Sequence, residues 1–113
     1  MKYNFYITPT FEKSAKPLLK KYLSLKDELQ DFVTKFGEYR ERSDDLGGGP
    51  YKVRIACKSK GKGKRGGLRI IYYEIVIQEE EKDIALLYIY NKSVIETVSD
   101  NFLKHLKTEF LKG

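Results

Sequence analysis

The sequence predicts an α+β fold: a small twisted antiparallel sheet with an N-terminal helical hairpin, a C-terminal helix, and the helices on one face. The first half of the chain carries apolar residues at helical spacing, whereas residues 51–91 alternate in polarity or are rich in Ile, Val and Tyr. The predicted order β, α, α, β, β, β, α is typical of such folds. With 113 residues, 41% of them hydrophobic, the chain suffices for one domain, residues 1–113.

The first strand and helix are indicated at the N-terminus. Apolar and polar residues alternate over residues 3–7, which predicts a strand. Thr8-Pro9 then predicts a helix N-cap followed by proline at the first helical position. This helix is expected to run to about Tyr22 and to be kinked, broken or restarted at Pro17.

A second helix and a loop follow. Ser24 with Asp27 indicates a capping box, and apolar residues at helical spacing extend the helix to Phe36, with Gly37 as a plausible stop. Residues 38–50 are polar and end in three glycines and a proline, so we expect a mobile loop there.

Three strands and a helix are expected in the second half. Residues 51–58 alternate strictly and should place Lys52, Arg54 and Lys58 on one face. Further strands are predicted over 68–78 and 84–91, and residues 59–67 form a second mobile loop. The final helix should begin at a cap, Ser99, and its apolar side consists of Phe102, Leu103, Leu106 and Phe110.

The positive charge is concentrated in one segment. The net charge is +6, from 22 Lys and Arg and 16 Asp and Glu, and residues 46–73 contain no acid. That segment holds eight cations, so the remainder has 14 against all 16 acids. The eight are Lys52, Arg54, Lys58, Lys60, Lys62, Lys64, Arg65 and Arg69. A localised basic centre predicts a polyanionic partner, and the alternative is a solvated loop that only aids solubility.

The basic residues suit phosphate binding. A hairpin would place the loop KSKGKGKRGG at its tip and join it to Lys52, Arg54 and Arg69 as one cationic surface. Glycines let backbone N–H groups approach phosphates, and arginine offers a planar fork for two oxygens. The loop does not fit a nucleotide-binding P-loop, because it lacks the required Ser or Thr and joins two strands.

Other residue types exclude further classes of site. A single cysteine, Cys57, rules out an internal disulfide and a cysteine-based zinc site, and it is expected to pack in the core. His105, the only histidine, is expected at the surface or core edge of the final helix. No signal-peptide pattern or membrane-length apolar segment occurs, so a cytoplasmic location is expected.

Residues 51–73, YKVRIACKSKGKGKRGGLRIIYY, resemble the RelE/ParE superfamily of toxins from bacterial type II toxin–antitoxin modules, and most closely its RelE/HigB-like branch. In that branch the middle strands are joined by a glycine–lysine loop of this kind. Residues 8–29 resemble its helical hairpin, and residues 86–106 resemble its last strand and C-terminal helix. The resemblance therefore covers nearly the whole chain and implies a RelE-like fold.

The resemblance implies an mRNA interferase, a ribosome-dependent endoribonuclease that stops translation. Such enzymes cleave RNA without a metal or other cofactor, through attack of a ribose 2′-hydroxyl on the adjacent phosphate. The implied partners are a cognate antitoxin, mRNA in the ribosomal A site and ribosomal RNA. The toxin would be a monomer or part of a toxin–antitoxin hetero-oligomer.

Residue roles follow from the same resemblance. Arg54 and Arg69 correspond to positions that hold the scissile phosphate, and Lys64 to a loop lysine that this branch usually has. Lys52 or Lys58 could serve as base, since crowding by cations favours loss of a proton. Tyr90 and Lys92 are further catalytic candidates, which could stack on a base, or position or protonate the RNA. The candidates for RNA binding alone are Lys58, Lys60, Lys62 and Arg65.

This chain departs from better-known members at the proton donor. It has Ser99 or its neighbours where some have a tyrosine in the C-terminal helix, and Asn91 and Lys92 where others have a histidine. The general acid therefore stays open. Two further hypotheses remain, a ParE-like inhibitor of DNA gyrase and a non-catalytic RNA-binding module. The cationic cluster favours the nuclease over the gyrase inhibitor, which needs no phosphate-binding site.

Overall fold

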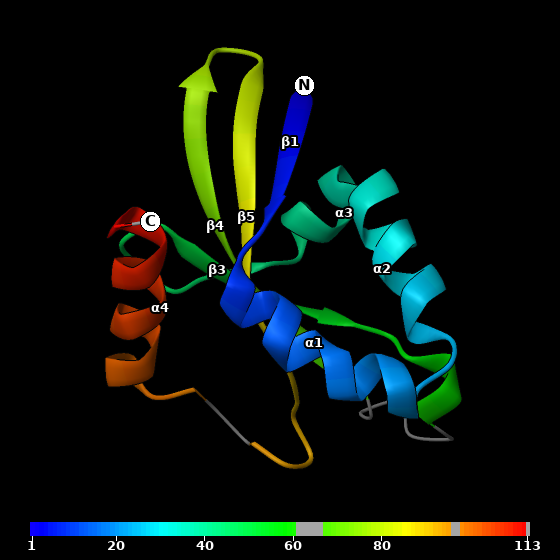
Figure 1. Ribbon diagram of the computed structural model, residues 1–113. Helices are drawn as coiled ribbons and strands as arrows, with labels where there is room; N and C mark the ends of the chain where they lie inside the picture. The colour runs from blue at the N-terminus through cyan, green and yellow to red at the C-terminus, as the bar shows by residue number, and fades with distance from the viewer. Residues whose placement is uncertain (61–66, 96–97, 113) are drawn as a thin grey trace.

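The computed structural model describes residues 1–60, 67–95 and 98–112, and its centre is a five-stranded sheet in the order β1-β5-β4-β3-β2 (Figure 1). The strands are β1 (Lys2–Ile7), β2 (Asp44–Asp45), β3 (Pro50–Ile55), β4 (Leu68–Gln78) and β5 (Glu81–Asn91). The helices are α1 (Pro9–Lys21), α2 (Leu25–Thr34), α3 (Phe36–Glu41), α4 (Asp100–Lys112) and a 3₁₀ turn at Lys58–Lys60. The predicted α+β class is confirmed.

The sheet is mixed rather than purely antiparallel. β2, β3, β4 and β5 pair antiparallel in turn, but β1 pairs parallel to β5, with Phe5 opposite Ile84. The chain reaches this arrangement because β1 is followed by the helices and β2–β4 before β5 returns beside it. Alternation within residues 3–7 predicted the strand correctly but carries no information about its partner.

The helices lie on both faces of the sheet, so the prediction that they share one face is wrong. α1, α2 and α3 cover one face, where Phe11, Leu25, Phe32 and Phe36 pack on the strands. α4 covers the other through a second cluster that includes Leu106, and Figure 1 shows it opposite α2 and α3. We call these the α1–α3 face and the α4 face. β3 and β4 contribute residues to the α1–α3 face at every second position, so the residues between them point to the α4 face. β5 contributes Ala85, Leu87 and Tyr90 to the α4-face cluster.

Two helix caps agree with the sequence. The Thr8 Oγ1 accepts the Phe11 N–H at 3.2 Å, and the Ser99 Oγ accepts the Phe102 N–H at 3.1 Å. α1 then continues through Pro17 to Lys21, so a break at Pro17 is not seen.

The second helix differs from the prediction in three ways. The Ser24 side chain makes no cap bond and instead donates to Glu28 Oε1 at 3.0 Å. The helix ends at Thr34 rather than at Gly37, which lies inside α3. The predicted loop 38–50 contains the end of α3 and the short strand β2, which hairpin pairing with β3 holds in place.

A glycine turn closes the β2–β3 hairpin. Gly47, Gly48 and Gly49 have φ values of 84°, 74° and 113°, a region that side chains with a Cβ rarely enter. A Cβ on Gly49 would lie 2.6 Å from the Tyr73 ring. The three glycines are therefore needed for this turn, which brings β2 beside the first half of β3.

A partly buried ion network ties α3 to the sheet. The Glu74 carboxylate, with 7% of its side chain exposed, accepts Arg40 Nε at 2.6 Å and Lys82 Nζ at 2.9 Å. Arg40 also lies 4.1 Å from the centroid of the Tyr51 ring and donates to the Tyr51 hydroxyl at 2.9 Å. Burial raises the pKa of the Glu74 carboxyl, but the Arg40 and Lys82 hydrogen bonds outweigh it and hold this pKa below its ordinary value.

No helix in the described ranges is both long and apolar enough to cross a membrane.

Candidate nucleic-acid interface

Arg54, Arg69 and Tyr90 form one row across three neighbouring strands. Arg54 of β3 is directly opposite Arg69 of β4, and Arg69 is opposite Tyr90 of β5. Direct cross-strand neighbours have Cα atoms about 4.5–5.5 Å apart and side chains on the same face. All three therefore point to the α4 face, and the structure brings together the two arginines that the sequence analysis assigned to the phosphate.

The electrostatic environment of Arg69 is unusual for an arginine. Burial, followed by repulsion from Arg54, lowers its pKa below the ordinary value. Within the described residues, the Nη1 of Arg69 is buried without a hydrogen-bond partner, and neither Arg54 nor Arg69 forms an ion pair. Two like charges held side by side with no carboxylate are stabilised when an anion binds between or beside them.

Gly67 helps to set the position of Arg54. A Cβ on Gly67 would lie 2.4 Å from the Ile55 carbonyl oxygen and 3.1 Å from Arg54 Nε. A side chain at this position would thus collide with the β3 backbone and push the guanidinium aside. Gly67 is required because β4 starts in close contact with the end of β3.

Lys52 lies in the next row, with an acid that the sequence did not anticipate. It is opposite Ile71 of β4 on one side and Asp44 of β2 on the other. Because direct neighbours share a face, the Asp44 carboxylate reduces the positive charge around Lys52. We call Lys52, Arg54 and Arg69 the basic strip.

The prediction that Lys58 shares a strand face with Lys52 and Arg54 is wrong. β3 ends at Ile55, and Lys58–Lys60 form a 3₁₀ turn. Glu28 Oε2 accepts the Lys58 N–H at 2.6 Å, and Ser24 Oγ accepts the Ser59 N–H at 2.9 Å. These bonds fix the turn against the start of α2, which takes the backbone of Lys58 out of the strand. The Lys60 side chain is half-buried and that of Lys58 is exposed.

The candidates at the end of β5 have different surroundings. Tyr90 is 3% exposed and packs in the α4-face cluster, beside Tyr88 with ring centroids 5.9 Å apart. Burial raises its pKa, and the charge of Arg69 opposes this. Lys92 is exposed in the turn after β5, next to Asn91, which pairs with Leu68 at the start of β4. Tyr90 thus lies beside Arg69 on the neighbouring strand, while the Lys92 side chain is exposed to solvent.

A bulge explains why Leu87 and Tyr88, although consecutive in β5, both pack on the α4 face. Tyr72 is opposite Leu86 and Ile71 is opposite Tyr88, so Leu87 is an extra residue in β5. The extra residue shifts the alternation, a result that the sequence pattern of 84–91 did not reveal.

Arg42 is a cation near the strip that sequence reasoning missed. A hollow of about 300 Å³ has Arg42, Arg54 and Ala56 among its walls. Arg42 follows α3 and lies outside the acid-free segment, so only the fold brings it beside Arg54. Arg69 is not among the described residues that line the hollow, and its Cα pairs with Arg54 on the β4 side of β3.

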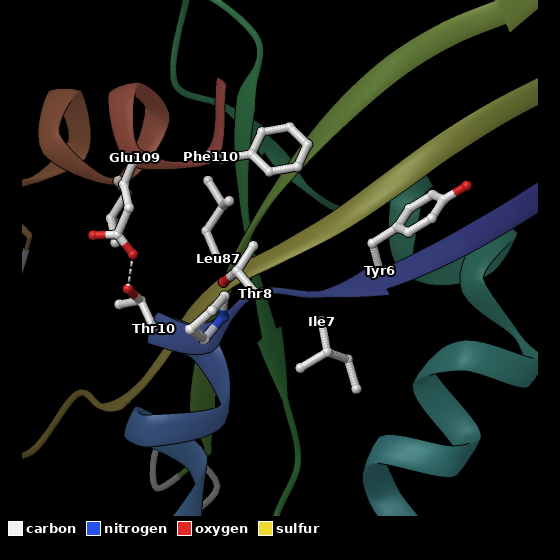
Figure 2. Close-up of a pocket in the computed structure, with 9 residues that line it drawn as sticks. Tyr6, Ile7, Thr8, Thr10, Leu87, Glu109 and Phe110 are labelled. Carbon is white, nitrogen blue, oxygen red and sulfur yellow. Dashed lines mark hydrogen bonds between the residues drawn. The ribbon is translucent and has the colours of Figure 1, made fainter. Parts of the chain in front are cut away.

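A second cavity, of about 400 Å³, has a different character. It lies between β1, the start of α1 and α4, and its lining includes Tyr6, Ile7, Leu87 and Phe110 (Figure 2). A hydrogen bond from Thr10 to Glu109 joins α1 to α4 at its rim. No cation is present among its described lining residues, so it suits apolar groups rather than phosphates.

The other predicted residues are placed as follows. Lys62, Lys64 and Arg65 lie outside the described residues. Cys57 is buried, which raises the pKa of its thiol, and His105 is 65% exposed and pairs with Glu109. In the described ranges, no group of three or more His, Cys, Asp or Glu side chains could hold a metal ion.

A family model decides the relationship of this chain to known proteins. The model is described as the RelE toxin of the RelE / RelB toxin-antitoxin system, and it matches residues 5–110. The chain belongs to the RelE toxin family. The resemblance to this superfamily is thereby confirmed over nearly the whole length. This RelE-family toxin is a toxin of a type II toxin–antitoxin system, and its partner in that system is an antitoxin.

Proposed function

We propose that this RelE-family toxin is a ribosome-dependent mRNA endonuclease that stops translation. The observation that carries the proposal is the cross-strand pair of Arg54 and Arg69, held on a rigid sheet without an acidic partner in the described residues. A phosphodiester matches this pair, since each guanidinium can donate two parallel hydrogen bonds to its oxygens.

The proposed reaction is an internal transfer within the RNA. The ribose 2′-oxygen attacks the adjacent phosphorus, the bond to the 5′-oxygen breaks, and a 2′,3′-cyclic phosphate forms. The RNA supplies its own nucleophile, so the protein must orient the phosphate and stabilise the added negative charge. Arg54 and Arg69 bind the non-bridging oxygens, where that charge grows in the transition state.

In this proposal, lysines near the two arginines carry out the two proton transfers that the reaction needs. Lys52 is one row from Arg69 on the same face, and in the proposed reaction it accepts the proton of the 2′-hydroxyl. Lys92 is exposed beyond the end of β5, and in the proposed reaction it donates a proton to the leaving 5′-oxygen. Tyr90 acts as a positioning residue, because its buried ring fixes Arg69 from the neighbouring strand. The ribosome supplies the bent conformation of the codon, which brings the 2′-oxygen in line with the leaving group.

Induction of the toxin followed by primer extension on a translated message tests the proposal. Breaks at codon-spaced positions are expected for the wild type, none are expected for Arg54→Gln at equal expression, and an untranslated copy of the message should stay intact. Damaged DNA with intact mRNA would identify a gyrase inhibitor. Intact mRNA and intact DNA would identify an RNA-binding module without turnover.

A further inference from the structure

We propose that Arg42 binds a second phosphate of the RNA backbone, adjacent to the phosphate held by Arg54. The inference deepens the proposed function, because it extends the substrate-binding surface from the basic strip to the end of α3. Its basis is the hollow whose described walls are Arg42, Arg54 and Ala56. Two guanidinium groups from separate parts of the chain border one space of about 300 Å³.

The structure holds Arg42 in place against the ring of Tyr39. Its guanidinium carbon lies 4.4 Å from the centroid of the Tyr39 ring. The Tyr39 hydroxyl donates to Asp31 Oδ2 at 2.8 Å, a bond that lowers the pKa of the Asp31 carboxyl and anchors the ring. Among the described residues, Arg42 itself forms no ion pair. When a guanidinium lies over an aromatic face, the N–H groups that point outward in the plane of the guanidinium stay free to bind an anion.

The sheet leaves room for the backbone of a nucleic acid at this point. β2 pairs only with Tyr51 and Lys52, so on the β2 side of β3 no described strand pairs with Val53 and the residues after it. Arg42 lies two residues before β2, and it lines the hollow together with Arg54 on this side of β3. The hollow borders Arg54 and Ala56 at that end of β3.

A series of phosphates fits this arrangement better than a single carboxylate. Arg69 and Arg54 are neighbours across β4 and β3, and Arg42 continues the series beyond β3. Single-stranded RNA repeats a negative charge at every nucleotide, so consecutive phosphates can meet consecutive arginines. No acid is among the described residues that line the hollow.

Binding of a short single-stranded RNA with 2′-O-methyl groups, which block cleavage, tests the role of Arg42. Arg42→Gln should weaken binding about fivefold at 0.1 M salt, since one phosphate contact contributes about 0.7 to the log–log salt slope of a single strand. The slope itself should become less steep by about 0.7. Arg42→Lys should keep the slope and lose less affinity, because the charge remains but the planar fork is lost.

Controls separate this role from others. Lys26→Gln removes an exposed charge from α2 and should leave affinity within twofold of the wild type. Thermal unfolding should show that Arg42→Gln is folded. Unchanged RNA affinity in Arg42→Gln, with cleavage intact in the wild type, overturns the Arg42 proposal alone. Loss of antitoxin affinity with unchanged RNA affinity also overturns it, in favour of a carboxylate partner. A wild type that binds no RNA overturns the proposed function as well.

Discussion

Replacement of Arg69 by glutamine should make this toxin more stable and less active at once. Arg69 is the arginine whose pKa is lowered by burial and by Arg54, and whose Nη1 lacks a partner in the described residues. Without RNA, its charge repels Arg54 and gains nothing in return. In the proposed reaction, the same charge binds the phosphate in the transition state.

The expected gain in unfolding free energy is smaller than the expected rise of the reaction barrier. Two unit charges 4 Å apart interact by about 1 kcal/mol in water and about 4 kcal/mol in a partly buried site. Because Arg54 is exposed, the relief in Arg69→Gln should be near the lower figure, about 1 kcal/mol of added unfolding free energy. Loss of one preorganised donor typically costs roughly 2.7–4 kcal/mol of barrier, which is a rate lower by about 10²–10³.

Two assays on the same preparation check this pair of expectations. Urea unfolding measures the free energy of unfolding, and single-turnover cleavage on programmed ribosomes measures the rate. Lys13→Gln is the matched control, because it removes an exposed charge from α1 and should change both by little. The reasoning fails if Arg69→Gln cleaves within fivefold of the wild type, or if its stability falls in parallel with its activity.

Three further predictions concern the scaffold and the charge. Gly67→Ala should lower both stability and cleavage, since its Cβ would meet the Ile55 carbonyl oxygen and Arg54; wild-type growth arrest by this variant would contradict the contact. Glu74→Gln should cost about 2 kcal/mol, below the ~3–5 kcal/mol of a fully buried pair because Arg40 is partly exposed. Because the folded pKa of Glu74 is lowered from 4.5, its contribution is present above pH 4.5 and is lost as pH falls further. The stability gap between the wild type and Glu74→Gln should therefore narrow in acid, and a constant gap would contradict the network. RNA affinity of the wild type should fall steeply between 50 and about 200 mM salt, and a flat response would exclude the basic strip as the contact surface.

The sequence alone determined the features that depend on neighbours along the chain. Alternation over 51–55 correctly placed Lys52 and Arg54 on one face, because a strand turns successive side chains to opposite sides. The caps at Thr8 and Ser99 were found for a similar reason, since each bond joins residues only three positions apart. The family, too, follows from the sequence itself.

Only the tertiary structure decided how distant segments meet. The parallel pairing of β1 with β5, the position of α4 opposite α1–α3, and the approach of Arg42 to Arg54 each join residues far apart in the chain. The same holds for Asp44, which pairs with Lys52 and brings an acid into a segment that looks purely basic. Such contacts depend on which surfaces are buried together, and a local pattern specifies only that a surface is available for burial.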